Sequence, residues 1–151
     1  MRGKAQLAWL RADLAANADV RCILAYFHRP MVSSGIFAAQ RMGRLWEVLY
    51  AAGVEVVVNG HEHFYERFAP QTPTGGASPA FGIRQFIVGT GGAHFHAAGA
   101  RAPHSEMVIQ ETLGVIKLTL RPSEYDWEFV DVASAVRDSG SGTCHGAPPA
   151  R

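Results

Sequence analysis

The chain has 151 residues, of which 48% are hydrophobic and 18% are charged, and its formal net charge at pH 7 is +1. A length of roughly 150 residues is typical of a single domain. The apolar fraction excludes intrinsic disorder, which needs low hydrophobicity and high net charge. The balanced charge excludes nucleic-acid binding through an overall basic field. Two cysteines are too few for a disulfide scaffold.

The sequence also argues against a membrane location. No segment reaches the ~18 uninterrupted apolar residues that a membrane-spanning helix requires. Arg2 and Lys4 resemble the basic start of a signal peptide, but Arg11 and Asp13 interrupt the apolar stretch that should follow. We therefore expect a globular domain that binds neither membranes nor nucleic acids, with its cellular compartment left open.

The first third of the chain predicts a helix followed by a strand. Over residues 6–16, Leu7, Leu10 and Leu14 recur at helical spacing, which is typical of an amphipathic helix. The continuous apolar run at residues 22–27 is typical of a strand buried on both faces, and it cannot continue as a central strand through Pro30.

The next elements repeat this order. Apolar side chains at helical spacing predict a second helix over residues 42–49, for which Gly53 is a suitable terminator. Residues 54–58 then predict a second buried strand, and the run at 86–88 predicts a third.

The remaining segments predict loops and an antiparallel pair of strands. Residues 71–82 and 93–105 are expected to be loops. Residues 115–120 and 125–130 are expected to pair across a short turn. The whole order predicts an α/β fold, a layered β-sheet with flanking helices and a β-rich C-terminal part. Residues 137–151 are expected to be a loose tail.

The two cysteines leave an alternative open. Cys22 lies in a predicted buried strand, where an inert thiol is expected. Cys144 becomes its disulfide partner only if the C-terminal tail folds back.

Three histidines follow the ends of predicted strands, and they are the candidate metal ligands. His28 comes after the first strand, and His61 and His63 come after the second in the sequence Gly-His-Glu-His. Neutral imidazole is the commonest side-chain metal ligand near neutral pH. A glycine before His61 is expected to let the backbone turn sharply. Functional residues collect at the carboxyl ends of strands in open α/β sheets, so a metal site is expected there.

Four stretches together resemble the C-terminal half of a calcineurin-like metallophosphoesterase, and most of all the purple acid phosphatase branch. They follow that family's order over about residues 6–130, and they are residues 6–10 (QLAWL), 27–31 (FHRPM), 59–67 (NGHEHFYER) and 88–92 (VGTGG). The resemblance implies an αββα sandwich whose C-terminal half occupies residues 1–136.

The resemblance also implies a hydrolase with a binuclear metal centre. The residues matching His28 and His61 would bind one metal ion and the residue matching His63 the other. The ions would be divalent or trivalent, namely Fe, Zn or Mn, and the substrate a phosphorylated small molecule such as a phosphate monoester. Resemblance to acid phosphatases further implies a secreted or periplasmic parent protein.

The sequence departs from this family in its acidic ligands. No aspartate is followed two residues later by His or preceded by Gly, so the family's Asp-x-His motif and its bridging Gly-Asp motif have no match here. Two dications surrounded only by neutral imidazoles repel strongly. We therefore expect the isolated chain to be inactive and to hold one loosely bound ion or none. Phe37 and Ala38 stand where some relatives carry histidines, so no catalytic residue and no general acid is assigned.

Other polar residues are given structural interpretations. The sequence His94-Phe95-His96 repeats the His-x-His spacing, but it lies in a predicted loop and is interpreted as surface. Tyr65, Glu66 and Arg67 are expected to brace the histidine loop.

Three functions are consistent with these observations. The first is a phosphatase of which this chain holds one half, and the second is a non-catalytic remnant with weak or no metal binding. The third is a cupin-like mononuclear metal enzyme, which the two predicted helices disfavour. For the first two, a sheet without its N-terminal strands is expected to self-associate through its exposed edge.

Overall fold

The structure is a computed structural model and describes residues 2–38 and 40–149. The helical elements of this part are α1 (Arg2–Ala16), the 3-10 turn η1 (Gln40–Met42) and α2 (Gly43–Ala51). The strands are β1 (Leu24–Tyr26), β2 (Val56–Asn59), β3 (Tyr65–Phe68), β4 (Arg84–Val88), β5 (Ser105–Ile109), β6 (Gly114–Leu120), β7 (Glu124–Asp131) and β8 (Val136–Thr143). Among these described residues, no helix has the length and apolar character needed to cross a bilayer.

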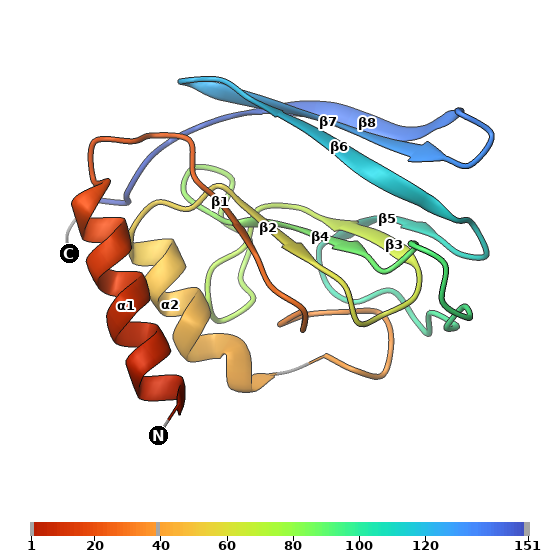
Figure 1. Cartoon of the computed structure of the whole chain (residues 1–151), viewed down its shortest axis with the longest axis horizontal. Helices are drawn as coiled ribbons and strands as arrows, with labels where there is room; N and C mark the ends of the chain where they lie inside the picture. The colour runs from red at the N-terminus through yellow and green to blue at the C-terminus, as the bar shows by residue number, and fades with distance from the viewer. Residues whose placement is uncertain (1, 39, 150–151) are drawn as a thin grey trace.

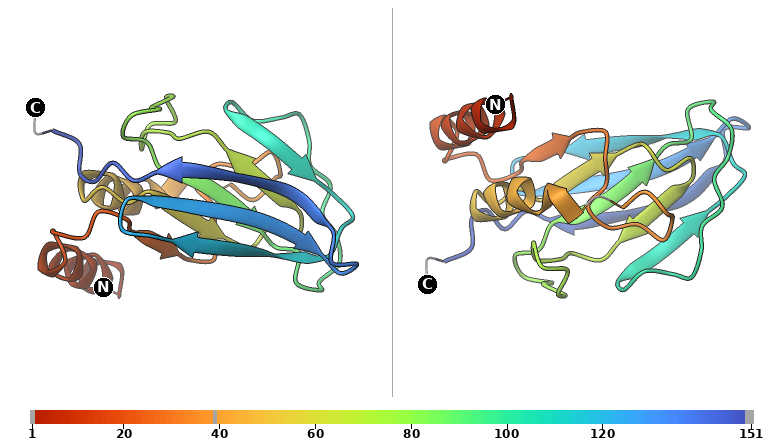
Figure 2. Two further views of the ribbon diagram at one scale, coloured as in Figure 1. Left: turned by 90° about the horizontal axis from the view of Figure 1, so that it is seen from above. Right: turned by 90° about the horizontal axis from the view of Figure 1, so that it is seen from below.

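The strands form two stacked sheets. The larger sheet has the order β1-β2-β4-β3-β5, in which β1, β2 and β4 are parallel and β3 is antiparallel to both of its neighbours. The smaller sheet is the antiparallel meander β6-β7-β8, which lies above the larger one in Figure 1. Helix α2 lies across the opposite face of the larger sheet, with α1 beside it toward β1 (Figure 2). The predicted layered α/β fold is confirmed.

Strand β2 is buried on both faces, as the sequence predicts. Val56 belongs to the apolar cluster between the two sheets, together with Phe86 and Phe129. Its neighbour Val57 belongs to the cluster between the larger sheet and the helices, which includes the buried Trp46. Successive side chains of a strand point to opposite faces, so one short strand connects both halves of the core.

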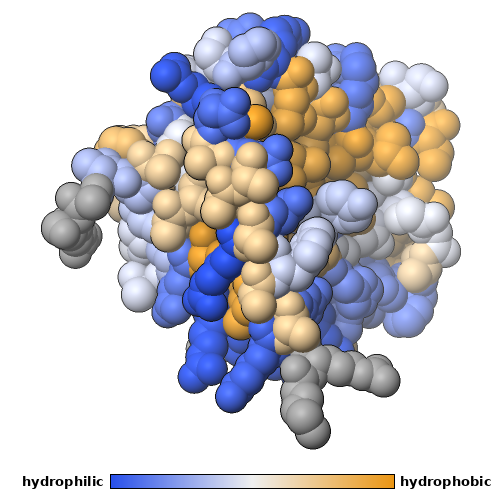
Figure 3. Space-filling model, turned by 60° about the vertical axis from the view of Figure 1, so that its left-hand side comes forward, coloured by the Kyte–Doolittle hydropathy of each residue, from blue (hydrophilic) through white to orange (hydrophobic). Residues whose placement is uncertain are grey.

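Strand β1 lies at an edge of the sheet, and the expectation that it is buried on both faces is wrong. Among the described residues it pairs with β2 alone, and Tyr26 is 81% exposed. A groove of about 380 Å³ runs between β1 and α1, lined by side chains that include Leu10, Leu14 and Phe27. Apolar side chains gather on the side of the molecule that carries α1 (Figure 3).

We expect this free edge to cause self-association. Unpaired backbone N–H and C=O groups on an edge strand can pair with a second copy, and a charged side chain on the edge opposes this. Light scattering after size-exclusion chromatography should show a dimer that dissociates on dilution, and Tyr26→Lys should shift the chain to monomer. The matched control is Val132→Lys, at an exposed position in the β7–β8 turn. A monomeric wild type at every concentration would refute this expectation.

The C-terminal segment is ordered, and the expectation of a loose tail over residues 137–151 is wrong for most of that range. Strand β8 pairs along β7 with Gly140 opposite Trp127 and Gly142 opposite Tyr125. A side chain at either glycine would collide with the aromatic ring that covers it. The absence of a side chain at both glycines is therefore what allows the two aromatic rings of β7 to pack against β8. The boundary of a phosphoesterase-like unit at residue 136 stays a prediction.

The chain beyond β8 folds back onto the larger sheet. Cys144 is buried and forms a disulfide with Cys22, with their Cα atoms 5.2 Å apart. This settles the alternative that the sequence left open. Next to it, Oε1 of the buried Glu55 accepts the backbone N–H groups of His145 at 2.5 Å and Gly146 at 3.0 Å. The disulfide and this carboxylate together fix the segment in place.

A buried polar network joins the two sheets at Asp138 in β8. Its Oδ2 accepts hydrogen bonds from the Tyr65 hydroxyl at 2.6 Å, from Nε of Arg67 at 2.7 Å and from Nε1 of Trp127 at 3.2 Å. Burial acts to raise the pKa of Asp138, but the hydrogen bonds from Arg67 and Tyr65 outweigh it and hold this pKa below its usual value. Burial and the Asp138 contact raise the pKa of Tyr65. The carboxylate is therefore the ionised partner of three donors.

Candidate metal site

The parallel pairing of β1 and β2 brings the first two candidate histidines together. Leu24 pairs with Val56 and Tyr26 with Val58, so both strands end at the same edge of the sheet. The pairing continues past β1, where Phe27 donates its N–H to the carbonyl of Val58 at 3.1 Å. This register brings His28 opposite Gly60, whose N–H its carbonyl accepts at 3.1 Å, and therefore next to His61.

His28 and His61 are in direct contact. Nδ1 of His61 lies 2.9 Å from Nε2 of His28, and the rings are edge-to-face with centroids 4.8 Å apart. Arg29 donates an N–H to Nε2 of His61 at 3.0 Å. A guanidinium cannot accept a hydrogen bond, so Nε2 is the acceptor, and Nδ1 carries the proton that neutral His61 donates to His28.

The backbone at His61 is in the left-handed region, with φ at 70°. The sequence predicts the sharp turn at Gly60. The φ angle of Gly60 is not positive, and His61 adopts the left-handed conformation instead. A non-glycine residue in this region costs roughly 1–3 kcal/mol and persists where the surroundings fix it, often at functional sites. Burial, then the positive charge of Arg29 and the neighbouring His28, lower the pKa of His61 from 6.5, which favours the neutral ring.

The third candidate, His63, lies beside two histidines from another part of the chain. The turn that carries it (residues 60–64, the histidine turn) joins β2 to β3, and residues 89–104 (the long loop) join β4 to β5. Strand β4 pairs with both β2 and β3, which brings the long loop against the histidine turn. Nδ1 of His63 lies 2.6 Å from the carbonyl oxygen of His94, and the rings of His63 and His96 stack with centroids 3.9 Å apart.

Glu62, between the two histidines of the turn, has a fully buried side chain. Its Oε1 accepts the N–H of Phe37 at 2.6 Å, and its Oε2 lies 3.2 Å from Nδ1 of His96. A side chain at Gly89 would collide with the Glu62 carbonyl, so the end of β4 packs tightly against the histidine turn. Sequence reasoning gave Glu62 no role. The sequence did offer one indication of such a role, because Glu62 is an acidic residue between two candidate metal ligands directly after a buried strand.

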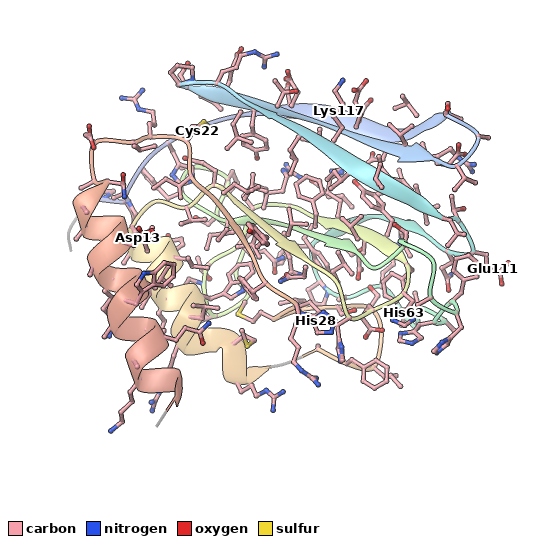
Figure 4. The ribbon with its side chains drawn as sticks, viewed as in Figure 1. Asp13, Cys22, His28, His63, Glu111 and Lys117 are labelled. Atoms are coloured by element: carbon pink, nitrogen blue, oxygen red, sulfur yellow. A yellow bond between two sulfur atoms is a disulfide. The ribbon has the colours of Figure 1, made fainter. Side chains whose placement is uncertain are left out.

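The histidines therefore form two neighbouring groups. One is the pair His28–His61, and the other is His63 with His94 and His96. The ring of Phe37 lies between them, 5.1 Å from that of His61 and 5.3 Å from that of His96. In Figure 4, His28 and His63 lie at the margin of the larger sheet that faces away from β6–β8.

The residues after the histidine turn have structural contacts, as expected. Glu66 is fully buried and accepts hydrogen bonds from the backbone and hydroxyl of Ser34 and from the hydroxyl of Ser105 at 2.7 Å. It thereby braces the loop that follows His28. Thr90, in the glycine-rich stretch, donates to the carbonyl of Gly114 at 2.8 Å.

The chemistry of these groups fits a transition-metal cation. Imidazole nitrogens suit zinc, iron, copper and nickel, whereas calcium and magnesium prefer oxygen ligands. All three predicted ligands follow the carboxyl ends of β1 and β2, at the same end of the sheet. His28 and His61 must give up their mutual hydrogen bond before they can bind a metal ion.

The comparisons with known proteins agree with the fold. No family model matches the chain. The sequence is 32% identical over 93 residues to purple acid phosphatase 18 of Arabidopsis thaliana, a match that covers 58% of this chain and 21% of that protein. The chain thus spans about a fifth of the length of this curated relative.

Two solved structures share the fold over almost the whole chain. The purple acid phosphatase PPD1 from yellow lupin (Lupinus luteus) seeds has a TM-score of 0.78 and 23% identity, over 90% of this chain and 28% of that one. GAP50, described as the anchor in the inner membrane complex of Plasmodium, has a TM-score of 0.74 and 15% identity, over 95% of this chain and 44% of that one.

The two sheets and their helices thus match the C-terminal part of the purple acid phosphatase fold. The open sheet with helices on one face does not fit the barrel of the cupin-like alternative. The predicted resemblance is confirmed: part of this chain is similar in sequence to a purple acid phosphatase, and the chain has the fold of the C-terminal part of one.

Proposed function

We propose that this chain provides the histidine half of a binuclear metal centre that hydrolyses phosphate monoesters. His28 and His61 would hold one ion, and His63 would hold the second. The acidic ligands would come from residues that this chain does not contain. When bound, the two ions would act as Lewis acids toward the phosphoryl group and lower the pKa of a water molecule.

The contact between His28 and His61 carries this proposal. Nitrogens of two ligands on one tetrahedral ion lie roughly 3.4 Å apart when each bond is about 2.1 Å, and Nε2 of His28 and Nδ1 of His61 are 2.9 Å apart. His63 donates Nδ1–H to a carbonyl, which leaves its Nε2 lone pair free. This arrangement supports ligation through Nε2, because a metal-binding histidine commonly donates its other N–H.

The disulfide bears on the compartment. Disulfides form and persist in oxidising compartments, so the Cys22–Cys144 bond supports a secreted or periplasmic location for the protein.

We expect no phosphatase activity from the chain alone. Purified chain with Zn²⁺, Mn²⁺ or Fe²⁺ should hydrolyse p-nitrophenyl phosphate no faster than the same buffer and metal, because no acidic ligand bridges the two ions. A second polypeptide that carries the Asp-x-His and Gly-Asp motifs of such a phosphatase should restore turnover. His61→Ala in this chain should abolish the restored activity, whereas the exposed His104→Asn should leave it unchanged.

Two results would contradict the proposal. Turnover by the isolated chain that disappears in His61→Ala would mean that the missing ligands are not needed. Absence of turnover in a verified complex of the two polypeptides would favour the second candidate function.

That second candidate is a non-catalytic protein. It is favoured by the structural likeness to GAP50, whose description is that of an anchor. It is also favoured by the hydrogen bond from Arg29 to Nε2 of His61. This bond keeps the proton of neutral His61 on Nδ1, where it points at His28 and opposes the binding of a metal ion between the two rings.

A further inference from the structure

The long loop brings two histidines, His94 and His96, that the proposed phosphatase centre does not use. The sequence predicts that both are surface residues. In the structure, His63, His94 and His96 each contribute one ring nitrogen to a cluster whose three nitrogens lie within 4.8 Å of one another. We propose that His63, His94 and His96 bind one divalent transition-metal ion, with zinc as the preferred ion, and need no ligand from outside this chain.

The hydrogen bonds around the cluster leave the required lone pairs available. Nδ1 of His63 donates to the carbonyl of His94, so its Nε2 is unprotonated in the neutral ring. Nδ1 of His96 faces Oε2 of Glu62 at 3.2 Å, and when it donates there, its Nε2 is also unprotonated. The backbone N–H of His63 points to the same Nδ1 at 3.3 Å, so ligation through Nε2 requires the tautomer in which Nδ1 donates to Glu62.

Glu62 completes a carboxylate–histidine–metal arrangement. Metal-ligating histidines usually donate their second N–H to a carboxylate or carbonyl, which fixes the ring and raises its basicity. His63 has the carbonyl and His96 has the carboxylate. Because Glu62 is fully buried, its negative charge also offsets the charge of a cation beside it more strongly than a solvated carboxylate would.

The geometry needs a small adjustment that the side chains allow. Ligand nitrogens around zinc lie roughly 3.4 Å apart, so the cluster must tighten from a spread of up to 4.8 Å. His94 is exposed and His96 lies in the same loop without a strand of its own. Rotation of the exposed His94 ring can therefore bring its nitrogen toward those of His63 and His96, with the fourth position left to solvent.

Neutral imidazoles select the class of ion. Three histidines and a water form a common open zinc site, and the same donors accept cobalt, nickel and copper. Magnesium and calcium are excluded as preferred ions, because they require oxygen ligands.

Cobalt titration tests the site directly. Tag-free chain is titrated with CoCl₂ and followed by the intense visible absorption of tetrahedral cobalt, and ZnCl₂ is then added to displace the cobalt. We expect saturation near one equivalent per chain. His94→Ala and His96→Ala should each weaken binding by at least about tenfold. Because His94 is exposed, its loss should leave the circular dichroism spectrum unchanged.

Two matched controls distinguish this site from the proposed phosphatase centre. His28→Ala removes a ligand of the predicted pair, and His104→Asn removes an exposed histidine outside the cluster. Both should bind cobalt as the wild type does. Binding that is lost in His28→Ala but kept in His94→Ala would overturn the three-histidine site, as would no tetrahedral absorption in the wild type. Failure of the phosphatase assay leaves these results unaffected.

Discussion

Reduction of the Cys22–Cys144 disulfide should lower the free energy of unfolding by about 2–5 kcal/mol. The two cysteines are 122 positions apart, and a cross-link over so long a loop removes much conformational entropy from the unfolded chain. Domains are stable by only about 5–15 kcal/mol, so this is a large share. Urea unfolding with and without dithiothreitol measures the loss.

The double variant Cys22→Ser, Cys144→Ser provides the control. It should unfold at the midpoint of the reduced wild type and should not respond to dithiothreitol. Thiol titration of the unfolded, unreduced wild type should find no free thiol. Equal midpoints for reduced and oxidised chain would show that the segment after β8 is held without the bond.

Asp138→Ala should be nearly as damaging, with an expected loss of about 3–5 kcal/mol, which is typical of breaking a buried ion pair by removal of one partner. The substitution leaves Arg67, Tyr65 and Trp127 without their shared acceptor between the sheets. Thermal and urea unfolding at neutral pH measure the effect. Asp126→Ala, which removes the partner of Arg121 in an exposed pair, should change stability little.

The same carboxylate makes stability sensitive to acid. The pKa of Asp138 is lower in the folded chain than in the unfolded chain. Its contribution is therefore present above the unfolded value of roughly 3.9 and is lost as the pH falls through the folded value. Asp138→Asn should flatten this acid limb of the stability profile. An unchanged acid limb in that variant would assign acid sensitivity to other carboxyl groups.

The parts of the fold that follow from local patterns could be predicted from the sequence. Helix α2, which ends at Ala51 shortly before Gly53, and the β6–β7 hairpin have apolar side chains at the period of their element. Helix α1 was predicted from Leu7, Leu10 and Leu14, and it begins earlier than predicted, at Arg2. Strand β8 could not be predicted in this way, because its residues are mostly polar or glycine. It forms because Gly140 and Gly142 leave room for the aromatic rings of β7.

The part of the site formed by residues at the ends of predicted strands could be predicted from the sequence. The part that depends on the order of strands in the sheet could not. His28 and His61 follow neighbouring parallel strands, and the sequence predicts both strands. The approach of His94 and His96 to His63 requires that β4 lie between β2 and β3. No local pattern specifies that order. The exposed Tyr26 was missed for a similar reason, because an apolar run does not show whether its strand is central or at an edge.

The two segments that carry the histidines differ greatly in their tolerance of change. Residues 60–64 are a short connection from β2 to β3 past the intervening β4, so an insertion there would displace β2 or β3. Residues 89–104 form a surface excursion, and such excursions accept altered length and composition during evolution. The imidazoles of His61 and His63 are thus bound to the architecture itself, whereas those of His94 and His96 can be gained, exchanged or discarded without rebuilding the protein.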